Sequence, residues 1–256
     1  MLRSACVAFC ALFLVISAAR AADPGTLTSK TKAAEITVTF DETVRVNPQL
    51  AADLVAEGKR WIAAKRAEAD KAWENAPERF GAGRRWKLTR DYAAAAVIAR
   101  HYVSVLRTDT MDVGGAHPSS ETGAVLWDTI PQKRASIRTF FKETADDGPT
   151  MKAILFRVLV ALKAEKLARK IEPAPGFDWS KGVEPKMTRI GAVTLAPSTE
   201  PGFSSGLIFH YPPATVGAHV EGAYEAFVPW ESLRALLSPE GAAIFGGSRP
   251  PRDANL

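Results

Sequence analysis

The stretch from Met111 to Asp128 reads MDVGGAHPSSETGAVLWD. Two adjacent glycines, Gly114 and Gly115, are followed by Ala-His-Pro, a polar turn and an apolar run. Glycine permits a positive φ and a close backbone approach, and a residue that precedes proline, such as His117, is pushed toward extended backbone. These features are typical of a tight connection between two strands. They would also suit the mouth of an active site with His117 as base or metal ligand.

Alternating apolar and polar residues on both sides of this stretch predict β-strands. The runs 86–92 and 97–106 alternate and could pair antiparallel, and the stretch then connects the second run to residues 125–127. Further strands are expected at residues 36–40, 189–195, 207–211 and 223–228.

Two longer segments predict helices. The segment 47–76 begins with Asn-Pro, which suits an N-cap and first helical position, and it has one apolar face. The segment 146–170 begins with acidic residues and carries one apolar stripe, and a short helix is expected at 229–237. Together these elements predict an α+β fold: a mostly antiparallel sheet with two main helices packed on it and a short C-terminal helix.

Residues 1–21 have the layout of a secretory signal peptide. Arg3 precedes an apolar core, and Ala19-Arg20-Ala21 is a small-x-small cleavage pattern. The core is shorter than the roughly 20 residues that a membrane-spanning helix needs, although a retained N-terminal anchor is the alternative. We expect cleavage after Ala21, a periplasmic location (secretion being the second choice) and no stable membrane anchor in the mature chain. The polar segment 22–33 that follows is expected to be mobile.

Composition excludes several classes of protein. Both cysteines, Cys6 and Cys10, lie in the leader, so the mature chain is not a disulfide scaffold, a thiol enzyme or a Cys-ligated zinc protein. The net charge of +5 falls to +3 when Arg3 and Arg20 are removed with the leader. The remaining basic residues are scattered among acids, so we expect no nucleic-acid partner, only a weak attraction to anionic envelope polymers.

The histidines are the main candidates for chemistry. None of His101, His117, His210 and His219 has the spacing of a helical zinc pair, and the sequence has no nucleophile elbow, phosphate loop or dinucleotide fingerprint. We therefore predict no catalytic residue, metal or cofactor. His117 remains the strongest functional candidate because it lies on a loop, with Asp109 or Asp112 as supporting acids. The interpretation that we favour is structural, with the His117 imidazole bonding backbone and locking the turn.

The segment 114–118 followed by 122–126 resembles the GGAHP signature of a bacterial extracytoplasmic domain of unknown function. That domain forms the C-terminal part of the anti-sigma factor RsiV and also lies beside the catalytic domain of the peptidoglycan deacetylase PdaC. Residues 206–211, 216–217, 221–222 and 228–233 follow the same family pattern. The chain departs from the pattern where Asp112-Val113 replaces an aromatic residue, where the tyrosine expected around Ala214 is absent, and where His219 replaces another tyrosine.

The resemblance implies a companion segment of strand plus long helix (22–85) and an RsiV-like α+β domain (86–239). The signal peptide (1–21) precedes them, and a flexible tail (240–256), which has no core-forming pattern, is expected to follow. In RsiV this domain recognises lysozyme. We therefore expect a soluble, non-catalytic cell-envelope binding protein whose ligand is peptidoglycan or a peptidoglycan-active protein such as lysozyme. The alternative is a periplasmic hydrolase or metal-dependent enzyme centred on His117. The candidate binding residues are Gly114, Gly115, His117, Pro118, His210, Tyr211 and His219.

Overall fold

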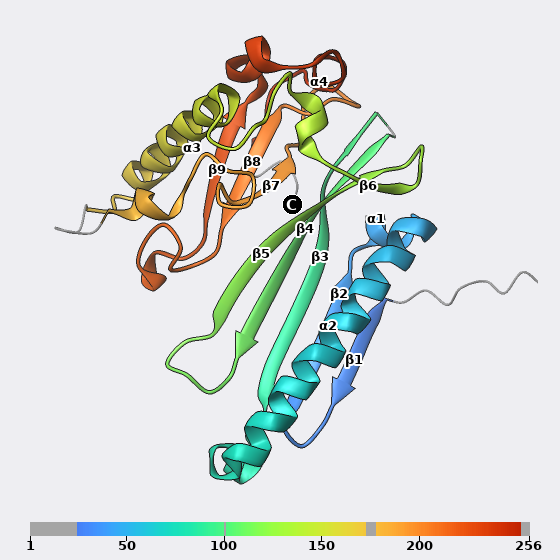
Figure 1. Ribbon diagram of the computed structural model, residues 1–256, viewed down its shortest axis with the longest axis vertical. Helices are drawn as coiled ribbons and strands as arrows, with labels where there is room; N and C mark the ends of the chain where they lie inside the picture. Colours follow the sequence, from blue (N-terminus) through green and yellow to red (C-terminus); the bar gives the residue numbers. More distant parts are fainter. Residues whose placement is uncertain (1–24, 100, 173–177, 252–256) are drawn as a thin grey trace, which may run out of the picture.

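The strands form two sheets in the computed structural model, which describes residues 25–99, 101–172 and 178–251 (Figure 1). The first sheet has six strands in the order β1 (Thr26–Lys30), β2 (Ala34–Phe40), β3 (Trp86–Ile98), β4 (Tyr102–Asp112), β5 (Ser119–Asp128) and β6 (Lys133–Ala135). The second has three, in the order β7 (Ala192–Leu195), β8 (Gly206–Tyr211) and β9 (Tyr224–Pro229). Every pairing is antiparallel except that of β2 with β3. The predicted signal peptide lies outside the described residues.

Two long helices accompany the sheets, as predicted. The α-helices are α1 (Glu42–Arg45), α2 (Pro48–Asn75), α3 (Pro149–Ala168) and α4 (Pro239–Ile244). Short 3-10 helices are η1 (Pro77–Gly83), η2 (Ile137–Phe140), η3 (Trp179–Gly182), η4 (His219–Glu221) and η5 (Trp230–Leu236). The α+β prediction, with its mostly antiparallel sheet and short C-terminal helix, is confirmed. Over the described ranges, no helix combines the length and apolar character needed to cross a bilayer.

The elements pack in layers. Helix α2 lies on one face of the six-stranded sheet, and the three-stranded sheet packs on the other side with α3 on its outer face (Figure 1). Every residue of β8 is buried because both of its faces are covered. Leu207 and Phe209 belong to the core beneath α3, whereas Ile208 and His210 face Leu106 of the six-stranded sheet. The space between the two sheets is therefore bounded by alternate residues of β8.

Three regional predictions need correction. The segment expected to be mobile contains β1, because Thr26–Lys30 pairs with β2. The expected boundary after residue 85 runs through one sheet, because β2 pairs with β3 from Ala34↔Trp86 to Phe40↔Tyr92. The segment predicted as a flexible tail contains α4, and Ile244 and Phe245 are buried in the core. A segment this short carries too few apolar residues for its periodicity to be recognised, so only the packed chain shows that it is ordered.

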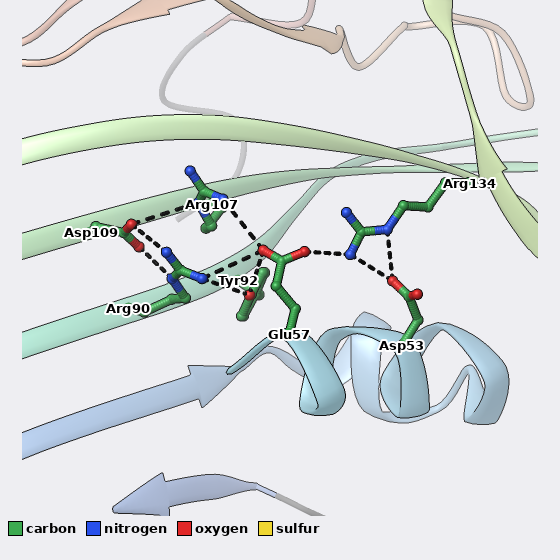
Figure 2. A network of polar contacts seen from close by, with 7 residues as sticks. All are labelled: Asp53, Glu57, Arg90, Tyr92, Arg107, Asp109 and Arg134. Atoms are coloured by element: carbon green, nitrogen blue, oxygen red, sulfur yellow. Dashed lines mark hydrogen bonds and ion pairs between the residues drawn. The ribbon is translucent and has the colours of Figure 1, made fainter. Parts of the chain in front are cut away.

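A charge network that is buried at Arg90 and Asp109 and reaches the surface at Arg134 joins α2 to the six-stranded sheet (Figure 2). Its members come from α2 (Asp53, Glu57), β3 (Arg90, Tyr92), β4 (Arg107, Asp109) and β6 (Arg134). Nε and Nη2 of Arg90 each donate to one carboxylate oxygen of Asp109 at 2.6 Å, and the two side chains are 6% and 2% exposed. The Arg90 guanidinium also lies over the ring of Trp61, 4.6 Å from its centroid.

Glu57 is the member of this network that links the helix to three strands. Its carboxylate accepts hydrogen bonds from the Tyr92 hydroxyl at 2.9 Å, from Arg107 at 3.3 Å and from Arg134. Burial alone would raise the pKa of Glu57, but the hydrogen bonds from Arg134 and Tyr92 outweigh burial and hold that pKa below its usual value. The charged form of Glu57 therefore fixes where α2 sits on the sheet.

Candidate functional site

The GGAHP segment is the loop between β4 and β5. Gly114 has φ +84°, and its N–H donates to Asp112 Oδ1 at 3.0 Å. The Ser119 hydroxyl donates to the Met111 carbonyl at 3.5 Å and closes the base of the loop. The prediction that a glycine here adopts a conformation unfavourable for other residues is confirmed, and the segment is a strand connection.

A second loop, residues 216–222, is part of the connection between β8 and β9 and contains η4. Glu221 fixes this loop: it accepts from the Ala218 N–H at 2.8 Å, from Lys166 Nζ on α3 at 2.7 Å and from the Tyr224 hydroxyl. Burial would raise the pKa of Glu221, but the bonds from Lys166, Tyr224 and Ala218 lower it to about 2. A Cβ at Gly217 would collide with the Glu221 carboxylate. Glycine at position 217 is therefore required for the contacts that Glu221 makes with Lys166 and Tyr224.

The two loops meet through their histidines. The His117 and His219 rings stack with centroids 4.7 Å apart and an interplanar angle of 19°. His219 Nε2 lies 3.3 Å from the Pro118 carbonyl oxygen, so it donates there when it carries the proton. Both histidines are exposed. We had expected His117 to lock its own turn through backbone, but the imidazole that contacts this backbone is that of His219.

The two loops that make this contact also carry exposed apolar side chains, and we call residues 113–118 and 216–222 together the loop pair. Val113, four residues before His117, is 49% exposed, and Val220, which follows His219 in the sequence, is 93% exposed. Exposed apolar groups that gather on one surface mark interaction sites more often than isolated ones do. Val220 was not singled out from the sequence, because one apolar residue in a loop is ordinary.

A cleft of about 680 Å³ lies between the two sheets, and some of its lining residues are close in sequence to the loop pair. One wall comes from β5, where Ser120 follows the first loop by two residues, and the other from β7, the end of β8 and Thr215, just before the second loop. Gly123 and Gly191 line the cleft. The cleft and the loop pair therefore share their supporting strands.

Two predicted binding residues, His210 and Tyr211, line this cleft from within the core. His210 Nε2 lies 2.8 Å from Thr194 Oγ1, and its Nδ1 is 3.7 Å from Glu225. Burial lowers the pKa of His210, which the charge of Glu225 only partly opposes. The Tyr211 hydroxyl donates to the Ile190 carbonyl, and burial raises its pKa. The seven candidates thus fall into two groups, with His210 and Tyr211 separate from the five on the loop pair.

The acids expected to support His117 are engaged elsewhere. Both oxygens of Asp109 accept from Arg90 in the buried network, and Asp112 accepts from the Gly114 N–H. Within residues 25–99, 101–172 and 178–251, no group of three His, Cys, Asp or Glu side chains is placed to hold a metal ion. Asp109 was misassigned because the sequence does not show that its direct partner on the neighbouring strand is Arg90.

Comparison with known proteins bears on the fold. No family model and no curated protein matches the sequence. A member of the DUF3298 family from Bacteroides fragilis is similar in structure, with a TM-score of 0.53 and 13% identity over 83% of this chain and 91% of that chain. A DUF3298 family protein from Pseudomonas aeruginosa PAO1 has a TM-score of 0.51 and 15% identity over 86% of this chain and 94% of that one.

The chain has the DUF3298 fold. At these identities the likeness concerns the fold alone. The first similarity covers 83% of this chain, whereas residues 86–239 make up only 154 of its 256 residues. The similarity therefore extends beyond the segment that carries the GGAHP pattern, in agreement with the single sheet that β2 and β3 share.

Proposed function

We propose that this protein is an exported, non-catalytic binding protein of the bacterial cell envelope, related to the domains of RsiV and PdaC, and that the loop pair contacts its ligand. The observation that carries the proposal is the stacking of His117 on His219, which joins two loops that each carry an exposed valine. Residues about 100 positions apart in the sequence thereby form one surface.

The loop pair is built as a fixed surface. Gly114 sets the shape of the first loop, and the Glu221–Lys166 ion pair holds the second loop to α3. A surface that is ordered before binding loses less conformational entropy when a ligand binds. Val113 and Val220 offer apolar contact, and the imidazoles offer hydrogen bonds.

Peptidoglycan is the ligand that we place first, and a peptidoglycan-active protein such as lysozyme is second. The mature chain would carry a net charge of +3 after loss of Arg3 and Arg20 from a total of +5. That charge favours encounter with anionic envelope polymers and slows encounter with a basic protein. The leader and its cleavage pattern support the periplasmic location. N-terminal sequencing of protein recovered from the periplasm should give Ala22 as the first residue.

Cosedimentation with purified, insoluble peptidoglycan tests the function, and a pull-down on immobilised lysozyme tests the second ligand. The double variant His117→Ala/His219→Ala and the variant Val220→Asp should each weaken binding by about tenfold or more. The matched control is Ile130→Asp, because Ile130 is 74% exposed on the turn between β5 and β6, outside the loop pair. If neither material retains the wild-type protein, the proposed function is wrong.

The same incubation examines the alternative of an enzyme centred on His117. Soluble fragments released from peptidoglycan would be detected by chromatography of the supernatant. We expect no release above that of heat-denatured protein. Release that His117→Ala abolishes, with peptidoglycan binding unchanged, would establish a hydrolase instead.

A further inference from the structure

A groove of about 670 Å³ lies between the edge strand β1 and helix α2, on the part of the molecule farthest along the sheet from β6 (Figure 1). The β1 side is formed by Thr26–Ser29. The helix side is a single stripe at spacings of three and four residues: Lys59, Ile62, Ala63, Arg66, Ala67 and Asp70. We propose that this groove binds an extended peptide segment of another protein, which adds to β1 as a seventh strand and presents a carboxylate to Lys59.

The backbone of β1 is oriented for such pairing. In an antiparallel pair, alternate residues bond to the partner strand and the others direct their N–H and C=O away from it. The Thr31 N–H donates to the Ala34 carbonyl at 2.8 Å, and this pair continues the register of the β1–β2 pairing. Hydrogen-bonded residues alternate along an antiparallel pair. Counting back from Thr31 by twos, Ser29 and Leu27 are the residues of β1 that bond to β2. Thr26, Thr28 and Lys30 therefore direct their N–H and C=O groups outward. An added strand would satisfy these groups.

Within the part of the chain that the structure describes, which begins at residue 25, the edge also lacks the features that commonly block strand addition. Natural edge strands are often protected by proline, by a bulge or by a covering element. The five residues of β1 read TLTSK, with regular register against β2 and a charge only at Lys30. Helix α2 packs on one face of β1 and β2, where a Cβ on Gly58 would lie 3.1 Å from Val38 and 3.5 Å from Leu27. The helix therefore contacts the face of β1, whereas the outward N–H and C=O groups of β1 lie in the plane of the sheet.

The groove between strand and helix supplies side-chain recognition. Leu27 and Ile62 give it an apolar floor, and the small side chains of Ala63 and Ala67 leave room above the helix. Alternate side chains of an added strand would point into this space, since successive residues of a strand face opposite sides. Strand addition next to a helix combines main-chain hydrogen bonds for affinity with side-chain pockets for specificity.

Charge decides between two kinds of occupant. Arg66 lies 3.5 Å from Asp70, whereas among the described residues Lys59 has no ion-pair partner. A second copy of this chain, paired edge to edge through β1, would bring a second groove with its own Lys59 to the same edge, and like charges repel. A peptide with an acidic side chain would instead complement Lys59. The charges therefore favour a heterologous peptide over self-association.

The probe is a phage-displayed library of random heptapeptides selected on the full chain, followed by fluorescence anisotropy with the recovered peptides after synthesis. We expect alternating apolar residues with at least one Asp or Glu. Thr28→Pro removes the outward N–H at an edge position where proline is tolerated, and it should weaken binding by about tenfold or more. Thr28→Val keeps that N–H and should stay within about twofold. Lys59→Glu should weaken binding by about fivefold or more.

Ala63→Trp fills the groove, leaves the β1 backbone intact and should also abolish binding, so the test does not depend on one variant. His117→Ala/His219→Ala should leave peptide affinity unchanged, which separates this site from the loop pair. The proposal is wrong if no peptide is enriched, or if selected peptides bind Thr28→Pro and Ala63→Trp as they bind wild type. Dimerisation in analytical ultracentrifugation that Thr28→Pro abolishes would assign the edge to a second copy and overturn the peptide proposal.

Discussion

The guanidinium group of Arg107 lies in the space that a side chain at position 123 would occupy. Arg107 and Gly123 are directly paired across β4 and β5, and a Cβ built on Gly123 would be 2.8 Å from both Cζ and Nη2 of Arg107. From this position Arg107 reaches Glu57 on α2 at 3.3 Å and Asp109 at 3.7 Å. The glycine therefore allows an arginine of one strand to lie across the next strand and support the helix above both.

Replacing Gly123 by alanine should displace Arg107 from Glu57. We expect the free energy of unfolding to fall by about 1 kcal/mol, the usual net contribution of one hydrogen bond. Urea denaturation is the measurement, and Arg107→Ala provides the background for a double-mutant cycle. In that background Gly123→Ala should have almost no effect. An equal cost in both backgrounds would show that position 123 matters for its backbone and not for Arg107.

The Arg90–Asp109 pair should be costly to break from one side. Asp109→Ala leaves the buried guanidinium of Arg90 without its bidentate partner, so we expect a loss of about 3–5 kcal/mol in the free energy of unfolding. Arg90→Met/Asp109→Leu, which replaces both charges by apolar groups, should recover most of that loss. Asp70→Ala is the control, because it breaks an exposed ion pair with Arg66 and should cost less than about 0.5 kcal/mol. Comparable losses in all three variants would contradict a special role for the buried pair.

The two glycines of the β4–β5 loop should respond differently to alanine. Gly114 has φ +84°, so Gly114→Ala should destabilise the protein by about 1 kcal/mol. A Cβ at Gly115 would meet only the His117 carbonyl, at 3.8 Å, and no positive φ is required there, so Gly115→Ala should be within about 0.5 kcal/mol of wild type. His117→Ala should also be nearly neutral for stability, because this side chain is exposed. Thermal denaturation of the three variants distinguishes these outcomes.

Acid should release the second loop from α3. The pKa of Glu221 is about 2 in the folded protein against an ordinary value of 4.5, so the unfolded chain takes up the proton first as the pH falls. The stability that Glu221 contributes is fully present above about pH 4.5 and is lost as the pH falls toward 2. Glu221→Gln should be less stable than wild type at neutral pH, by about 1–3 kcal/mol, and the difference should shrink across that interval.

Urea denaturation at several pH values, with the His219 ring resonances as a local probe, measures this effect. Glu143→Gln is a matched control, because the pKa of Glu143 is also lowered, by bonds to Thr150 and Ala145, but that residue is remote in sequence from the second loop. The His219 resonances should shift in Glu221→Gln and stay unchanged in Glu143→Gln. A shift in both variants would mean that the loop responds to general acid destabilisation.

Much of the fold could be predicted because its signals are local. The alternation in β3 and β4 and the apolar stripes of α2 and α3 can each be recognised within one segment, and so can the short apolar run of β8. Strand β1 escaped prediction because TLTSK has one apolar residue, and its order depends on hydrogen bonds to β2. The alternation of Arg90 with Leu88 and Tyr92 did place it on the inward face, but its partner on β4 could not be named without the register.

The sequence by itself determined the α+β class, the two main helices, the strand connection at GGAHP and the need for a positive φ within it. These follow from backbone sterics and from periodic burial, which are properties of neighbouring residues. Only the tertiary structure decided that His117 meets His219, that Glu57 joins three strands to α2, and that β1 and that helix form a groove. Each of these depends on which distant segments pack together, and packing is set by the whole set of contacts in the folded chain.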